Sequence, residues 1–266
     1  MPMAQLSDVS MFYEEVGNGE PLLITTGWAR AERAFVGHRD LLAEHYRCIR
    51  HDHRHIGRTL ATEEQTEIAT LADDLAELLD HLAIPNARVL AGGGMGALVG
   101  MQLAVRHPEK VRALHLGSPC LKADPFLVSI MGIWKRLRAI DPVLWAEEVT
   151  HFCYTPKTFA ERPEMVEGAR KARSQEQTFP DNRDFERLAD AYCAFDMTDT
   201  ARQITCPVQI SNGGELDLIT GPRMAREVHA AIGHSEFEVF EGCSHNYFVE
   251  NSERFGSMLL DFFGRV

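Results

Sequence analysis

The chain has 266 residues, of which 45% are hydrophobic and 25% are charged, a balance typical of globular proteins and not of disordered, fibrous or disulfide-stapled ones. Its 39 acidic and 27 basic residues give a net charge of −12. The resulting field repels polyanions, so nucleic acid and anionic membrane surfaces are excluded as expected partners. A chain of this length buries enough surface to fold without metals or disulfides.

The cysteines and the N-terminal sequence predict a cytoplasmic protein. The six cysteines show no C-x-x-C pair and no regular spacing, so we expect reduced thiols. The sequence MPMAQLSDVSMFYEEVG has no basic region followed by an apolar run, and no run of 18 apolar residues occurs. We therefore expect neither a signal peptide nor a membrane span.

The first elements in chain order are two short strands. Residues 10–15 alternate apolar and polar side chains, residues 17–19 supply turn residues, and residues 21–25 form an apolar run. This pattern predicts an opening β-hairpin.

The following segments alternate between strands and helices. Strands are expected at residues 47–51, 87–91 and 111–116, and helices at residues 68–82 and 95–107. Such close alternation predicts a parallel sheet.

A helical insertion is expected between residues 121 and 200. Strand signals disappear there, and prolines separate short helical stretches. The alternation then resumes, with strands at 207–211 and 236–240 and helices at 223–232 and 252–263. The sequence thus predicts one α/β body, residues 1–120 and 201–266, with a cap formed by residues 121–200.

A glycine-rich turn joins the strand at residues 87–91 to the helix after it. Its small residues match the nucleophile elbow G-x-S-x-G, with Gly92 and Gly96 at the flanking positions. The middle position is Gly94, so the attacking hydroxyl is absent. Alone, the turn would also suit a phosphate loop or close packing, although neither G-x-G-x-x-G in its context nor G-K-[ST] completes a phosphate motif.

With its surroundings, the chain resembles the α/β-hydrolase fold family, in its esterase, lactonase and haloperoxidase-like branch, over nearly its full length. Besides the elbow, four segments carry the resemblance: Thr25-Thr26-Gly27-Trp28, residues 52–59 (DHRHIGRT), Gly214-Glu215-Leu216-Asp217 and Gly242-Cys243-Ser244-His245. Thr26 stands where the family usually has histidine, and His55 where glycine is common. The resemblance implies a mostly parallel eight-stranded sheet flanked by helices, with the cap as a lid.

Two polar residues near strand ends are candidate catalytic groups. Asp217 and His245 each follow a predicted strand, at the sheet edge where α/β proteins collect ligand-binding groups. A carboxylate there would orient the imidazole, so His245 would act as a general base. Without the family pattern, Asp217 as a helix cap and His245 as a loop residue explain the spacing equally well.

The resemblance also implies an oxyanion hole and a pocket. It places the backbone N–H groups of Trp28 and Met95 in the hole. The residues expected near the substrate are Thr26, Gly27, Trp134, Trp145 and Tyr154. No cofactor is implied, the partner is a small-molecule substrate, and apolar cap residues would serve as lid, pocket wall or homodimer interface.

Other reactive side chains favour structural roles. Cys120 and Cys243 lie near strand ends but outside any elbow, so we expect small buried side chains. His51, His53 and His55 would share one face of an extended segment, yet no further ligand spacing accompanies them, and no metal site is expected.

Three interpretations of Gly94 remain open. The protein is an esterase or lactonase acting on a small, fairly apolar carbonyl compound, with an engineered change at its nucleophile. Alternatively, the glycine is natural, and the pair of His245 and Asp217 works as a general base in a lyase, cyclase, isomerase or cofactor-free oxygenase. In the third interpretation the protein is a non-catalytic binder. Serine acyl transfer is impossible in this chain as written.

Overall fold

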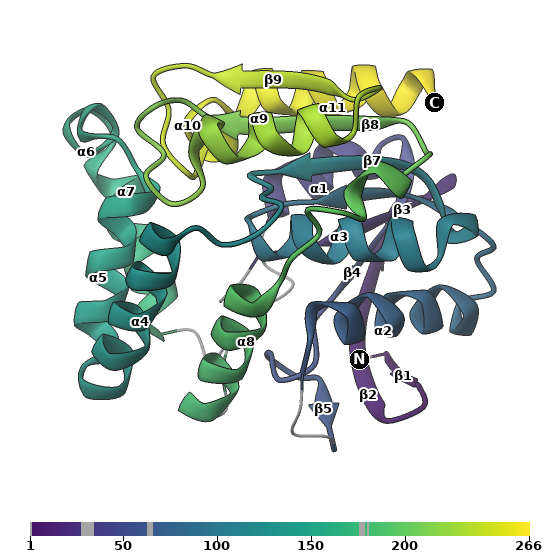
Figure 1. Ribbon diagram of the computed structural model, residues 1–266, viewed down its shortest axis with the longest axis horizontal. Coiled ribbons are helices and arrows are strands. Elements are labelled where there is room, and N and C mark those ends of the chain that lie inside the picture. Colours follow the sequence, from purple (N-terminus) through teal and green to yellow (C-terminus); the bar gives the residue numbers. More distant parts are fainter. Residues whose placement is uncertain (1, 28–34, 63–65, 176–178, 180) are drawn as a thin grey trace.

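The computed structural model describes residues 2–27, 35–62, 66–175, 179 and 181–266. One twisted sheet lies between two layers of helices (Figure 1). Eight of its strands follow one another in the order β1-β2-β4-β3-β6-β7-β8-β9. Their bounds are Met3–Gln5, Val9–Val16, Tyr46–His51, Glu20–Thr25, Ala87–Ala91, Val111–Gly117, Val208–Gly213 and Glu236–Phe240. The predicted mostly parallel sheet flanked by helices is confirmed.

Only the N-terminal edge of the described sheet is antiparallel. β1 and β4 both pair antiparallel with β2, whereas the six strands from β4 to β9 pair in parallel. A two-residue strand, β5 (Leu60–Ala61), also pairs with β2. The parallel strands bring their carboxyl ends to one edge, where the loops after β3, β6, β8 and β9 meet.

The predicted opening hairpin is wrong. β2 and β3 are the strands expected there, but β4 lies between them and pairs with both. The turn between β2 and β3 does contain two glycines with positive φ, Gly17 at 84° and Gly19 at 114°. The turn therefore passes over the end of β4 instead of joining neighbouring strands.

Helices cover both faces of the sheet and enclose two cores. One core packs α2 (Ile68–His81), α3 (Met95–Arg106) and α9 (Gly221–Ala231) against the sheet. The other packs α1 (Val36–Ala43) and α11 (Ser252–Arg265) against the opposite face. Short helical segments η1 (Pro108–Lys110), η2 (Ala201–Gln203) and α10 (Tyr247–Glu250) complete the body.

Five α-helices in the described chain lie between β7 and β8. They are α4 (Pro125–Ile140), α5 (Pro142–Cys153), α6 (Pro156–Glu161), α7 (Pro163–Gln175) and α8 (Asn182–Ala194), and all fall within residues 121–200. Figure 1 shows α4 to α7 grouped at one side of the sheet body. We call these five helices the cap.

The cap prolines begin helices and do not interrupt them. α4, α5, α6 and α7 each start at a proline, where the missing N–H costs no hydrogen bond. Asp124, Asp141 and Thr155 precede three of these prolines, and each side chain accepts a hydrogen bond from a backbone N–H of the first turn. Pro180 lies outside the described residues.

The chain enters the cap and returns from it at one place on the body. Lys122 and Asp196 form an isolated antiparallel bridge, and the N–H of Met197 donates to the carbonyl of Leu121 at 2.8 Å. The two connecting segments therefore run side by side. In the described part of the chain, no helix is long and apolar enough to cross a membrane.

Candidate active site

The turn between β6 and α3 has the backbone of a nucleophile elbow. Gly94 is the N-cap of α3, with φ 72° and ψ −91°, a conformation that side-chain-bearing residues adopt only under strain. A Cβ at Gly96 would lie 2.7 Å from the backbone oxygen of Thr26, so the helix approaches β3 too closely for a side chain. Both glycines thus serve the close strand-to-helix turn that the motif predicts.

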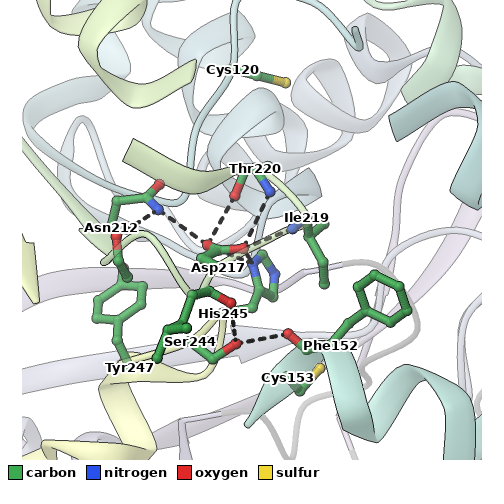
Figure 2. A network of polar contacts seen from close by, with 12 residues as sticks. Cys120, Phe152, Cys153, Asn212, Asp217, Ile219, Thr220, Ser244, His245 and Tyr247 are labelled. Atoms are coloured by element: carbon green, nitrogen blue, oxygen red, sulfur yellow. Dashed lines mark hydrogen bonds and ion pairs between the residues drawn. The ribbon is translucent and has the colours of Figure 1, made fainter. Parts of the chain in front are cut away.

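Asp217 and His245 meet at the carboxyl edge of the sheet. Asp217 follows β8 and His245 follows β9, and His245 Nδ1 lies 3.1 Å and 3.2 Å from the two carboxylate oxygens (Figure 2). Because Nδ1 contacts the carboxylate, Nε2 is the ring nitrogen that can contact a molecule in the cavity that His245 lines. This is the geometry of a base oriented by a carboxylate.

Several donors hold the Asp217 carboxylate. Asn212 Nδ2 donates at 3.1 Å, and the backbone N–H groups of Ile219 and Thr220 donate at 3.0 and 3.3 Å (Figure 2). Burial opposes ionisation of this buried group, but His245 and the N–H groups of Ile219 and Thr220 outweigh it and lower the pKa of Asp217. Asp217 is therefore a fixed anion at neutral pH.

The loop that carries His245 is tied to the cap. Ser244 Oγ donates to the carbonyl of Phe152 at 2.9 Å (Figure 2). The carbonyl of Leu216, at 3.1 Å, is a second acceptor for the same hydroxyl. The N–H of Asn246 donates to the carbonyl of Cys153 at 2.9 Å. The end of α5 thus helps to set the position of the base.

A cavity of about 490 Å³ lies between the elbow, His245 and the cap. Its volume suits a small organic molecule. The cap contributes Met131, Trp134, Trp145, Val149, Cys153, Arg162, Met165, Arg173 and Tyr192; the body contributes Gly27, Phe35, Gly37, His38, Gly93, Gly94, Ile219, His245, Asn246, Phe248, Val249 and Ser252. The walls are mainly apolar and aromatic, with two guanidinium groups among them.

Only some of the pocket residues predicted from the sequence line the cavity. Gly27, Trp134 and Trp145 line the cavity, whereas Thr26 and Tyr154 are not among the described residues that do so. Thr26 is fully buried, and its backbone is hydrogen-bonded to His53. Tyr154 follows the last turn of α5, where its N–H donates to the carbonyl of Thr150.

Of the two predicted oxyanion donors, one falls in the described chain. Met95 is the first residue of α3, so its backbone N–H has no acceptor within the helix. Trp28 lies outside the described residues.

The cysteines near the site are weak nucleophile candidates. Cys120 is fully buried, and burial raises the pKa of its thiol to about 12. Burial likewise raises the pKa of Cys243. Both thiols stay protonated at neutral pH, and the thiolate is the reactive form.

The three neighbouring histidines do not act as one group. The His51 and His53 rings contact edge to face, and burial lowers the pKa of both. His55 has φ 64°, consistent with a position where glycine is common, and its Nδ1 lies 3.3 Å from Asp184 of α8. Across the described residues, no group of three or more His, Cys, Asp or Glu side chains is placed to hold a metal ion.

Tyr192 is a pocket residue that sequence reasoning missed. It comes from the last turn of α8, and no local motif marks it. A Cβ at Gly94 would have the Tyr192 hydroxyl oxygen as its nearest neighbour, at 3.2 Å. Phe35, His38 and Phe248 were also missed, since only the packing of α1 and α10 brings them to the cavity.

Comparison with known proteins identifies the family of this chain and similar folds. A family model described as serine aminopeptidase, S33, matches residues 37–252. A relative described as a candidate carbamate hydrolase, RutD, from Azorhizobium caulinodans is 26% identical, covering 100% of this chain and 99% of its own. The enol-lactonase from Burkholderia xenovorans has a TM-score of 0.88 at 22% identity, covering 99% of this chain and 100% of its own. A thermophilic esterase from Thermogutta terrifontis has a TM-score of 0.86 at 22% identity, covering 100% and 99%.

Proposed function

Because the chain belongs to the serine aminopeptidase S33 family of α/β hydrolases, we propose that it is a general-base enzyme that hydrolyses a small, fairly apolar ester or lactone. The observation that carries this proposal is the hydrogen bond between Asp217 and His245, which leaves Nε2 facing a cavity that Gly94 also lines. His245 would take the proton from water, and the Met95 N–H would stabilise the oxyanion formed at the carbonyl.

The cavity walls support the proposed substrate class. Met131, Trp134, Trp145 and Val149 offer apolar surface to the body of a substrate. The enol-lactonase and the esterase are named for lactone and ester substrates. Carbonyl compounds of that kind are therefore the first to assay.

Without a nucleophile at residue 94, the reaction forms no acyl-enzyme there. The same base would also serve to abstract a proton from the substrate itself, as in a lyase or isomerase. Product analysis separates the two reactions, since hydrolysis alone incorporates oxygen from labelled water.

The test compares the wild-type protein with the His245→Ala variant on p-nitrophenyl acetate and on γ-butyrolactone. We expect the loss of the base to lower kcat by about 10² to 10⁴-fold. The control is His45→Ala, which removes an exposed histidine directly before β4, at the sheet edge opposite to the one that carries His245. Equal turnover by wild type and His245→Ala would eliminate His245 as the base.

A further inference from the structure

The cap delivers a hydroxyl group to the place where the elbow lacks one. A Cβ built on Gly94 would lie 3.2 Å from Tyr192 Oη, and 3.6 Å and 3.8 Å from two carbons of the same ring. Among the described residues, Tyr192 therefore has the side chain nearest to the nucleophile position. Gly94, Tyr192 and His245 line the same cavity.

The Tyr192 hydroxyl is a neutral group that both donates and accepts hydrogen bonds. The side chain is 2% exposed, and burial raises its pKa well above 10, with Cys120 and Asp217 adding to the effect. The phenol stays protonated at neutral pH, so Tyr192 is not itself a base or a nucleophile in this site.

One neighbour of the hydroxyl lies away from the cavity. Cys120 Sγ is 3.9 Å from Tyr192 Oη, and Cys120 is fully buried and does not line the cavity. If the Tyr192 hydroxyl donates its hydrogen bond to this sulfur, the lone pairs of Oη are free to accept a hydrogen bond from a molecule next to Gly94.

We propose that Tyr192 Oη and His245 Nε2 together bind the water molecule that attacks the substrate, in the space next to Gly94 that a serine side chain would otherwise fill. This inference rests on the function proposed above. One hydrogen of the water points to Nε2 and the other to Oη. A lone pair of the water oxygen is thereby left for the carbonyl carbon of an ester or lactone.

The reaction balances with these groups alone. His245 Nε2 takes a proton from the water as its oxygen bonds to the carbonyl carbon, and the π electron pair moves to the carbonyl oxygen, facing the Met95 N–H. When the tetrahedral intermediate collapses, the electron pair on the oxyanion re-forms the carbonyl double bond and the bond to the alcohol oxygen breaks. That oxygen takes the proton from His245, which returns the base to its neutral form.

The first test is the Tyr192→Phe variant, assayed on p-nitrophenyl acetate over a range of pH. Loss of water positioning should lower kcat by about tenfold to a hundredfold with little change in KM. The pH at which the rate falls should not change, because His245 remains the base. Tyr46→Phe makes the same chemical change at a buried tyrosine at the start of β4, and it should leave both parameters unchanged.

The second test is a crystal structure of the wild-type protein and of Tyr192→Phe. We expect a water within hydrogen-bond distance of both Tyr192 Oη and His245 Nε2 in the wild type, and its loss in the variant. This readout does not depend on the chosen substrate, so it decides the proposal even where the probe ester is not turned over.

The outcomes separate this proposal from the function it rests on. Wild-type turnover by Tyr192→Phe, with His245→Ala inactive, would overturn the water site and leave general-base hydrolysis standing. Full activity of His245→Ala would overturn both. A wild-type crystal structure without a water between the two side chains would overturn the water site alone.

Discussion

Replacing Gly94 with serine tests both the geometry of the elbow and the latent chemistry around it. With φ 72° and ψ −91°, residue 94 has a conformation that costs a side-chain-bearing residue about 1–3 kcal/mol. The new Cβ would also stand 3.2 Å from Tyr192 Oη, a tight contact that a small shift of the ring relieves. For a chain of this size, each kcal/mol lowers Tm by roughly 2–4 °C. We therefore expect Tm to fall by about 2–12 °C.

The matched control is Gly94→Ala, which carries the same strain without a hydroxyl. Both variants should lose stability equally in thermal unfolding. Only Gly94→Ser should gain an acetyl group on mass spectrometry with p-nitrophenyl acetate, because only it places a nucleophile in the cavity that His245 lines. Its turnover should exceed that of Gly94→Ala by at least about a hundredfold, a small part of the roughly 10⁶-fold supplied by a complete triad.

Two results would refute this reasoning. Unchanged stability in both variants would show that the positive φ at residue 94 imposes no strain on a side chain. A stable Gly94→Ser that is never acylated would show that the base does not reach the nucleophile position.

Three further predictions follow from the described geometry. Asp217→Asn should lower kcat by about 10⁴-fold, since His245 Nδ1 loses the carboxylate that fixes its tautomer; steady-state kinetics on p-nitrophenyl acetate would check this, and a loss below tenfold would contradict the assigned role. Gly96→Ala should lower the free energy of unfolding in urea by about 1–3 kcal/mol, because its Cβ would lie 2.7 Å from the backbone oxygen of Thr26. The control is Gly132→Ala on α4, where a Cβ would meet no atom within 4 Å; this change should be neutral or stabilising by up to about 1 kcal/mol. Burial lowers the pKa of His51 and of His115 to about 4. Because the unfolded chain binds more protons than the folded one below about pH 6.5, the free energy of unfolding should fall by about 2 kcal/mol per histidine from about pH 7 to about pH 5. A urea midpoint that does not change with pH over that range would contradict this prediction.

Local patterns were sufficient to predict most elements of the body. The spacing of apolar residues in α2 and the β-strand, glycine turn and helix around Gly94 are properties of adjacent residues, so the sequence reveals them directly. The positions of Asp217 and His245 followed from their motifs, and the structure brings their side chains into contact.

What the sequence did not reveal depends on residues far apart in the chain. The turn at Gly17 and Gly19 predicted a hairpin because nothing in those residues shows that β4 will lie between the two strands. Tyr192 reaches the elbow only through the packing of α8 against the body, 98 residues after Gly94 along the printed sequence. His55 is held by Asp184 of the same helix, which no periodicity predicts.

The antiparallel bridge between Lys122 and Asp196 brings the two ends of the cap together, so its five helices form one module inserted at one point of the chain. Since the segments that enter and leave the cap are neighbours, we expect a short linker between Leu121 and Met197 to preserve the pairing of β7 with β8. Exchange of the module would alter the wall opposite the base, and it would also replace Tyr192. A change of cap would therefore change the preferred substrate shape and the group that faces residue 94 at the same time.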